Sequence, residues 1–128
     1  MCGIVGLVGV DKKEYGGRLR DMLGSIAYRG PDETGFYTDE TVALAHARLA
    51  ILDPQNGRQP AVSEDGGVVV IFNGEIFNFL ALRRQLEEKG HIVANHSDTA
   101  ILPHLYEEYG LDMFTKLNGQ FAVAIWDK

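Results

Sequence analysis

Cys2 is the only cysteine of the 128-residue chain, and it directly follows the initiator methionine. Because cysteine is small, we expect Met1 to be removed, which leaves a free α-amino group on the residue that carries the thiol. An α-amino group has a reference pKa of about 7.7–8.0, so near neutral pH part of it is unprotonated and can accept the thiol proton. A terminal cysteine thus supplies both a nucleophile and its base. The chemistry open to this pair is attack on an acyl carbon.

A lone cysteine also has a simpler interpretation. One thiol cannot form an intramolecular disulfide, and a free cysteine at an arbitrary position is more often a small buried hydrophobic residue than a reactive group. It is the location of Cys2 at the start of the chain that favours the reactive role.

Asn73 and Gly74 are candidates for stabilising the oxyanion that such an attack produces. An oxyanion needs fixed donors about 3 Å away. The pair follows the β-branched run from Val68 to Phe72 and offers a side-chain amide and a backbone N–H that the absent Cβ leaves accessible. Taken alone, Asn-Gly is most often a turn, and the pattern predicts that the strand ends in a sharp turn there.

Arg48 and Asp98 are charged residues in apolar surroundings. Arg48 can be a solvated hairpin arginine or a bidentate clamp on a carboxylate. Asp98 can be a plain helix cap or an acceptor for a substrate ammonium group. The residue types leave both pairs of alternatives open.

The elements that must position these residues follow from periodicity. We expect strands over 2–10, two over 35–48 joined around Asp39-Glu40, and others over 68–72 and 121–128, with a short extra strand over Leu49 to Leu52. Helices are expected within 13–30, over 76–89 with an end at Gly90, and behind a cap at Ser97 or Asp98. Residues 53–60 are rich in turn formers and predict a loop.

Pro103 falls inside the last of these helices. It would remove a hydrogen bond there and crowd the preceding turn at a cost of about 3 kcal/mol, so we expect a kink or a helix that begins later than Asp98. Strands at both ends of the chain, a hairpin-rich middle and separate helical blocks favour an α+β fold with helices packed outside sheets.

The net charge and the apolar runs of the chain argue against some classes of function. Twelve Lys and Arg against eighteen Asp and Glu give a formal charge of −6 with no basic cluster, which argues against nucleic acid as a partner. No apolar run approaches the roughly 20 residues that cross a bilayer, and the start lacks the pattern of a secretion signal. We therefore expect a cytoplasmic protein that does not bind membranes.

Several stretches occur in a fixed order behind the initiating Met-Cys. They are MCGIVG, YRGPDETG, ALAHARLAILD, Gln59-Pro60, FNGEIFN, HSDT, LYEEYG and LNGQFAVAIWD. In this order they resemble the glutaminase domain of class II glutamine amidotransferases, most closely that of glutamine-hydrolysing asparagine synthetases. The resemblance implies the αββα sandwich of the N-terminal nucleophile hydrolases, here without its last strands because the chain ends after Trp126-Asp127-Lys128.

The resemblance also implies roles for particular residues. Cys2 would attack the side-chain amide of glutamine, form a γ-glutamyl thioester and release ammonia before water regenerates the thiol, with Asn73 and Gly74 as the oxyanion hole. Arg48 matches the clamp on the α-carboxylate of glutamine. Asp98, with Glu75 as a second candidate, matches the contact to its α-ammonium group. The remaining implied positions are the pocket-lining Leu49, Ile51 and Leu52, and Arg29 in a loop near the site.

As a whole, the resemblance predicts one truncated glutaminase domain over residues 1–128 that needs no cofactor or metal. ATP and magnesium would belong to a synthetase domain. We expect no such domain within these residues, since they contain no Gly-rich nucleotide loop. The expected partners are glutamine and a synthetase domain or subunit that receives the ammonia, and a homodimer is allowed.

Two alternatives remain at this stage. The first is a catalytically silent glutamine-binding or regulatory domain of the same fold. The second is a metal protein that uses His46, His91, His96 and His104. The spacings of these histidines match no familiar ligand set, which favours surface or hydrogen-bonded roles for them.

Overall fold

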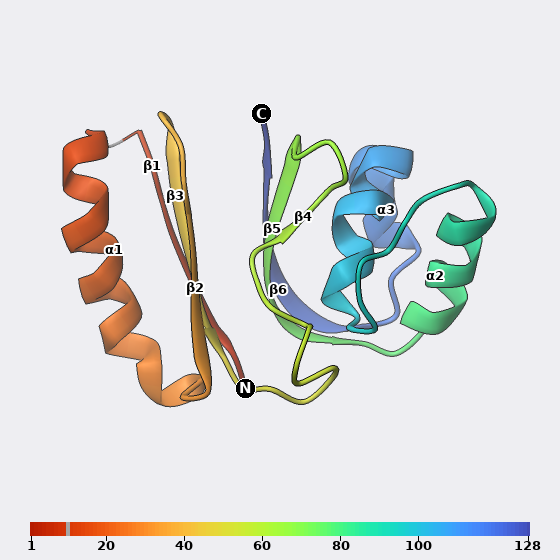
Figure 1. Cartoon of the computed structure of the whole chain (residues 1–128), viewed down its shortest axis with the longest axis horizontal. Coiled ribbons are helices and arrows are strands. Elements are labelled where there is room, and N and C mark those ends of the chain that lie inside the picture. Colours follow the sequence, from red (N-terminus) through yellow and green to blue (C-terminus); the bar gives the residue numbers. More distant parts are fainter. Residues whose placement is uncertain (10) are drawn as a thin grey trace.

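The computed structural model of the chain describes residues 1–9 and 11–128. Over these residues an α-helix, two β-sheets and a further pair of α-helices are stacked in four layers (Figure 1). This αββα order confirms the α+β sandwich predicted from the sequence. The expected first strand extended to Val10, which lies outside the described residues.

The first sheet has the antiparallel strand order β1-β3-β2. Its strands are β1 (Gly3–Val8), β2 (Glu33–Thr38) and β3 (Val42–Arg48). Helix α1 (Lys12–Ile26), followed by the short 3₁₀ helix η1 (Ala27–Arg29), covers the outer face of this sheet.

The second sheet has the order β4-β5-β6 and is also antiparallel. Its strands are β4 (Ala61–Val62), β5 (Val68–Ile76) and β6 (Gly119–Asp127). The helices beside it are α2 (Phe79–Glu88), η2 (Thr99–Ile101), α3 (Leu102–Tyr109) and η3 (Gly110–Thr115).

Strand β3 is buried along its whole length because both of its faces are covered. Ala43, Ala45 and Ala47 face α1, where their small side chains accommodate the larger apolar residues of the helix. The intervening Val42 and Leu44 face the second sheet. The period of two in a strand therefore assigns even-numbered residues of β3 to the space between the sheets.

Strand β5 shows the same division. Val70 and Phe72 belong to the core beneath α2 and α3, whereas Val69 and Ile71 pack against the first sheet. Asp39, in the turn between β2 and β3, links the two sheets at one end, since its Oδ2 accepts a hydrogen bond from Trp126 Nε1 at 2.5 Å.

His46 follows Val42 and Leu44 on the face of β3 that is turned toward the second sheet. It is 1% exposed, and its Nε2 has no hydrogen-bond partner within the described part of the chain. Burial lowers the pKa of His46 from 6.5 to about 4, and the nearby Arg48 charge adds to this effect. Of the two roles predicted for the histidines, surface or hydrogen-bonded, the surface role is wrong for His46, because the residue is buried.

Stability should depend on pH through His46. Below pH 6.5 the unfolded chain binds a proton there that the folded chain excludes until about pH 4, so stability is lost as pH falls through this window. The full loss is about 3 kcal/mol. Urea unfolding across the window should show a weaker pH dependence in His46→Leu than in the unmodified chain. Equal slopes in the two proteins would contradict the assignment.

The predicted turn at Asn73-Gly74 and the short strand over Leu49 to Leu52 are both wrong. Strand β5 continues through Gly74, which pairs with Phe121 of β6. A Cβ on Gly74 would lie 2.2 Å from the carbonyl oxygen of Gln120, so the glycine is needed for this close approach and not for a turn. The segment 49–52 has no strand partner and forms part of an irregular loop.

Pro103 lies in the first turn of α3, where a missing N–H leaves no hydrogen bond unmade. The helix thus begins later than Asp98, which was one of the two outcomes predicted for it. Of the two expected caps, Ser97 acts as one, because its Oγ accepts a hydrogen bond from the backbone N–H of Ala100. Among the residues with an assigned structure, no helix combines the length and apolar character needed to cross a membrane.

Candidate active site

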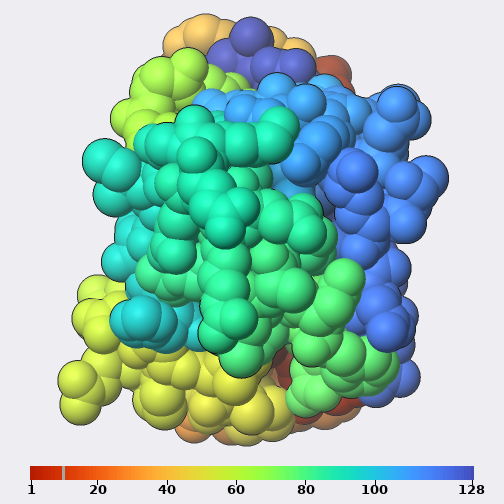
Figure 2. Space-filling view, turned by 90° about the vertical axis from the view of Figure 1, so that its right-hand side faces the viewer, coloured from red at the N-terminus to blue at the C-terminus, as the bar shows by residue number. Residues whose placement is uncertain are grey.

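A cavity of about 410 Å³ lies at the end of the sandwich that holds the N-terminus. Figure 2 shows N-terminal atoms, in red, at the bottom of a hollow in this region. The cavity is lined by all the catalytic and substrate-binding residues proposed from the sequence, namely Cys2, Arg48, Leu49, Ile51, Leu52, Asn73, Gly74, Glu75 and Asp98. The fold thus brings together residues that are up to 96 positions apart in the sequence.

Strand periodicity explains this convergence. Arg48 ends β3 on the face that also carries Val42, Leu44 and His46 toward the second sheet. Asn73 has the same relation to Val69 and Ile71 on β5. Two facing strands therefore direct functional side chains into the same end of the space between the sheets.

Cys2 lies directly before β1, beside the end of β3. Its Sγ accepts a hydrogen bond from the backbone N–H of Leu49 at 3.3 Å and lies 3.6 Å from the Leu49 carbonyl oxygen. The guanidinium of Arg29 donates from Nε to the carbonyl oxygen of Cys2 at 3.0 Å. Arg29 therefore holds the backbone of Cys2 in place and lies near the site, in the short η1 segment.

The terminal residue Met1 is 70% exposed, so the bond between Met1 and Cys2 is at the surface. The thiol is half-buried, not enclosed in the core, and faces the cavity. Both features are what a terminal nucleophile requires: its preceding residue can be removed, and its sulfur can meet a ligand.

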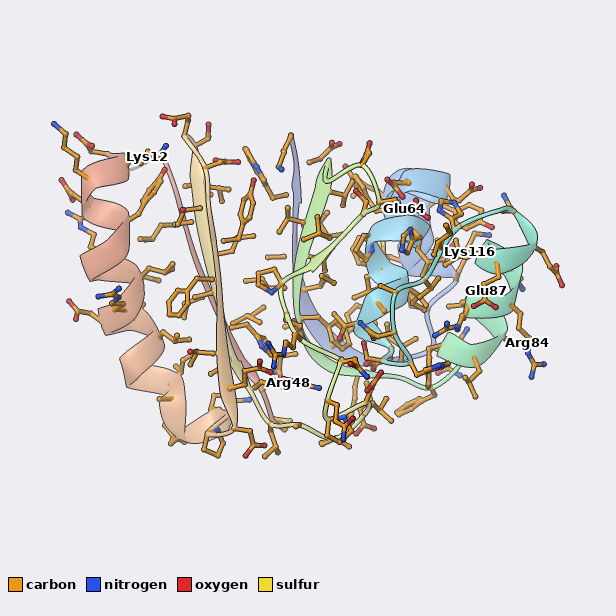
Figure 3. The ribbon with its side chains drawn as sticks, viewed as in Figure 1. Lys12, Arg48, Glu64, Arg84, Glu87 and Lys116 are labelled. Atoms are coloured by element: carbon orange, nitrogen blue, oxygen red, sulfur yellow. The ribbon has the colours of Figure 1, made fainter. Side chains whose placement is uncertain are left out.

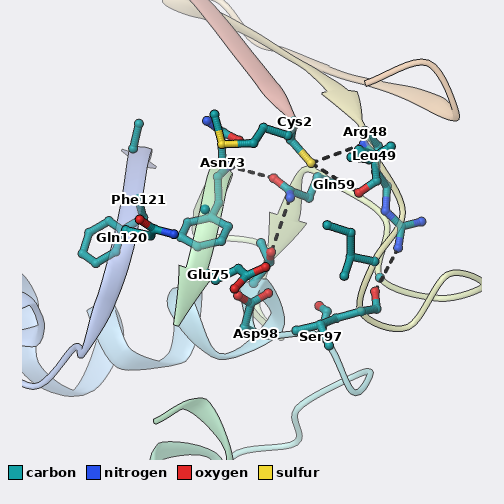
Figure 4. Close-up of a pocket in the computed structure, with 18 residues that line it drawn as sticks. Cys2, Arg48, Leu49, Gln59, Asn73, Glu75, Ser97, Asp98, Gln120 and Phe121 are labelled. Carbon is teal, nitrogen blue, oxygen red and sulfur yellow. Dashed lines mark hydrogen bonds between the residues drawn. The ribbon is translucent and has the colours of Figure 1, made fainter. Parts of the chain in front are cut away.

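Asn73 and Cys2 lie at the same end of the cavity (Figure 4). Within the described residues, no hydrogen bond engages the side-chain amide of Asn73, so its N–H groups are available to a ligand. Gly74 lines the same wall without a side chain. This arrangement fits the pair of donors that an oxyanion needs.

Gln59 lines the cavity but was not predicted as a site residue. Its Oε1 accepts from the backbone N–H of Phe72 at 2.7 Å, and its Nε2 donates to Thr99 Oγ1 at 3.3 Å. It thereby joins the 53–60 loop, strand β5 and helix η2 in one wall. The only sequence signal for Gln59 was its place in the Gln-Pro pair of the family pattern.

Arg48 is 4% exposed, so it is not a solvated hairpin arginine. Its Nη1 donates to Glu33 Oε2 at 3.0 Å and to the Pro54 carbonyl at 3.1 Å. Its Nη2 donates to the carbonyl oxygens of Leu52 at 3.3 Å and Asp53 at 2.8 Å. The guanidinium thus holds the loop that forms one wall of the cavity and already has a carboxylate partner.

Asp98 and Glu75 place two carboxylates on the opposite wall (Figure 4). Asp98 is 5% exposed, and its Oδ2 accepts from the backbone N–H of Ile76 at 3.0 Å. Burial raises the pKa of Asp98, and the charge of Glu75 raises it further. A cationic group in the cavity would oppose both contributions, because it would stabilise the ionised form of Asp98.

The sandwich fold and a cavity with a terminal thiol define a class of proteins. The chain belongs to the glutamine amidotransferase domain family, whose match covers residues 1–128. Among curated proteins it is 39% identical over 132 residues to "Asparagine synthetase [glutamine-hydrolyzing] 2" of Bacillus subtilis (strain 168), a match that covers 100% of this chain and 17% of that protein. It is 40% identical over 129 residues to "Asparagine synthetase [glutamine-hydrolyzing] 1" of Arabidopsis thaliana, covering 99% of this chain and 22% of that protein.

A solved structure supports the fold. The glutamine phosphoribosylpyrophosphate amidotransferase of B. subtilis, complexed with ADP and GMP, matches with a TM-score of 0.69 at 24% identity, over 98% of this chain and 34% of that chain. The chain also spans only about a fifth of the length of the curated relatives, at 17% and 22%. It is homologous to the glutaminase region of the asparagine synthetases, as predicted from the ordered motifs.

Proposed function

We propose that this chain hydrolyses the side-chain amide of glutamine through Cys2, giving glutamate and ammonia. The observation that carries the proposal is the convergence of the terminal thiol, the Asn73-Gly74 donors and the acidic pair Glu75 and Asp98 on one cavity. Membership of the glutamine amidotransferase family and relatives named as glutamine-hydrolysing enzymes support the same reaction.

In the proposed reaction, removal of Met1 frees the α-amino group of Cys2, which takes the proton of the thiol. The sulfur then bonds to the amide carbon of glutamine, and the carbonyl oxygen becomes an oxyanion that accepts hydrogen bonds from Asn73 and Gly74. As the C–N bond breaks, the protonated amine returns its proton to the leaving nitrogen and ammonia departs. Water then attacks the thioester while the amine accepts a proton from it. The C–S bond breaks, glutamate leaves, and the protonated amine returns its proton to the sulfur.

Substrate binding follows from the charges of the walls. The carboxylate of Asp98, with that of Glu75, would hold the α-ammonium group of glutamine. Arg48 would meet the α-carboxylate and share its guanidinium between this group and Glu33, its present partner. Leu49, Ile51 and Leu52 would complete the pocket around the aliphatic part of the substrate.

The ammonia would pass to an asparagine synthetase domain or subunit that uses ATP and magnesium. This step rests on the names of the relatives and on their length, since the chain matches only about a fifth of each, at 17% and 22%.

The central test is release of glutamate by the purified chain that begins at Cys2. Replacing the nucleophile removes the covalent step, so Cys2→Ala should lower the rate of glutamate release at least about 10³-fold. Ser25→Ala, a change on the exposed surface of α1, is the control and should keep the full rate. Glutamine binding without glutamate release by the unmodified chain would instead identify a catalytically silent domain.

Asp98→Asn should raise the KM for glutamine about tenfold or more while changing kcat much less, because it removes an attraction to the ammonium group made before the reaction begins. In the unmodified chain, KM should also rise as pH falls toward the raised pKa of Asp98, because protonation removes the same charge. The asparagine variant should lack this part of the pH dependence. A KM that is the same in both proteins at all pH values would exclude Asp98 from the site.

A further inference from the structure

Two histidines and two glutamates form a second cluster of potential ligands, made by Glu64, His91, His104 and Glu107. One ligand atom from each residue lies within 4.8 Å of all the others. The cluster is separate from the Cys2 cavity, because none of its members lines that cavity. Figure 3 shows Glu64 beside α3, at the other end of the sandwich from Arg48.

The four residues come from three separate segments. Glu64 lies in the turn between β4 and β5, and His91 lies just after α2. His104 and Glu107 are three positions apart on α3 and so share one face of the helix. No short motif in the sequence contains them, which is why the histidine spacings gave no metal signal.

The distances between the nitrogen and oxygen atoms are similar to one another. His104 Nδ1 lies 3.5 Å from Glu107 Oε2 and 3.7 Å from Glu64 Oε2. His91 Nδ1 lies 3.8 Å from each of the same two oxygen atoms. Four ligands about 2.0–2.2 Å from a tetrahedral Zn²⁺ ion are about 3.3–3.6 Å apart, so these four N···O distances need a contraction of only a few tenths of an ångström. The remaining pairs lie within 4.8 Å and would contract by up to about 1.5 Å on binding.

His104 provides independent evidence that the cluster binds a ligand. The residue is 2% exposed, and its Nδ1 has no hydrogen-bond partner among the residues that the structure places. Buried polar atoms without a partner are uncommon in folded proteins, and an ion is one of the established explanations for them. The nitrogen faces the carboxylates of Glu64 and Glu107.

The negative charges of Glu64 and Glu107 also favour a bound cation. Within residues 1–9 and 11–128, neither Glu64 nor Glu107 forms an ion pair with a lysine or arginine. Two carboxylates held this close repel each other when both are ionised. A divalent cation between them would neutralise both.

Neighbouring groups orient the ligands. His91 Nε2 lies 2.9 Å from Glu108 Oε1, which directs a proton to Nε2 and leaves Nδ1 as the free electron pair. Glu64 Oε1 accepts from the backbone N–H of Ile92 at 2.6 Å, which leaves Oε2 for the cluster. A histidine that donates its second ring N–H to a carboxylate is the usual arrangement at protein metal sites.

We propose that Glu64, His91, His104 and Glu107 bind one Zn²⁺ ion in four-coordinate geometry. Two imidazoles with two carboxylates favour zinc over magnesium or calcium, which take oxygen ligands. Four protein ligands close the coordination shell, so the role is structural. The ion ties the β4–β5 turn and the segment after α2 to helix α3. The proposed zinc site departs from the expectation that the domain needs no metal. It is independent of the proposal that the chain hydrolyses glutamine.

The test uses the full chain with Cys2→Ser, since a terminal thiol could itself bind zinc. After chelator treatment, calorimetric titration should give one Zn²⁺ per chain, and the bound ion should raise the melting temperature by mass action. Titration with Co²⁺ should give the intense visible absorption of a tetrahedral site. Binding at less than one ion per chain, no rise in melting temperature, or the weak spectrum of octahedral Co²⁺ would overturn the proposal.

Glu64→Gln with Glu107→Gln removes both anionic ligands and keeps the size of each side chain. Loss of outer-shell groups alone costs up to about 100-fold in metal affinity, so this double variant should bind Zn²⁺ at least about 100-fold more weakly. Glu87→Gln with Glu88→Gln makes the same charge change on the exposed face of α2 and should keep full affinity. Equal affinity in the two double variants would overturn the site, and urea unfolding without metal verifies that both are folded.

Discussion

A chain that keeps Met1 should release glutamate from glutamine at least about 100-fold more slowly than the same chain beginning at Cys2, since general-base catalysis contributes about 10²–10⁴-fold. With Met1 attached, the nitrogen of Cys2 belongs to a peptide bond and cannot take the thiol proton. The thiol accepts a hydrogen bond from a backbone N–H, and among the described residues no histidine lines its cavity to replace that base.

The comparison needs two preparations whose first residue is established by intact mass. Insertion of a lysine between Met1 and Cys2 gives the blocked chain, because a long second residue prevents methionine removal. Glutamine affinity, measured by calorimetry in both preparations, is the control for obstruction of the cavity by the added residues. Full turnover by the blocked chain would show that another group acts as the base.

Asn73→Ala should lower kcat about 10²–10³-fold and leave the KM for glutamine nearly unchanged. The side-chain amide would donate to an oxygen atom that carries full negative charge only after the sulfur has attacked. Its loss therefore affects the transition state more than the bound substrate. Steady-state kinetics with glutamine, measured as glutamate release, separates the two effects.

Asn73→Asp tests the charge at the same position, because it keeps the size of the side chain but replaces the donor by an anion. Its kcat should be at least as low as that of the alanine variant. Asn118→Ala, just beyond the end of the same strand pair, is the control and should leave both constants unchanged. An unaltered kcat in Asn73→Ala would remove this amide from the proposed oxyanion hole.

Much of the fold could be predicted from local patterns. The spacing of Leu19, Leu23 and Ile26 marks the face of α1 that packs on the first sheet, and the β-branched run from Val68 to Phe72 identifies the core of β5. The predictions from these patterns are confirmed because the spacing of apolar residues depends mainly on which face of an element is buried. The nine catalytic and substrate-binding residues predicted from the ordered motifs all line one cavity of the structure.

The parts that could not be predicted depend on contacts between distant segments. Asn73-Gly74 has the composition of a turn, but pairing with β6 keeps it extended, because strand pairing outweighs the local preference. The partners of Arg48 include Glu33, on a strand whose register had to be known first. Likewise His91 and His104 are neighbours only after α2 and α3 have packed on the second sheet.

Cys2 is held by one sheet and Asn73 by the other. The distance between the sulfur of Cys2 and the side-chain amide of Asn73 therefore depends on the apolar layer that packs between the two sheets. The fully buried residues of that layer are Val42, Leu44, Val69 and Ile71. A misplacement of reacting groups by about 1 Å can lower a rate by about 10²-fold. The thickness of this layer should therefore influence the rate of the proposed reaction, although the layer lies away from the reacting atoms.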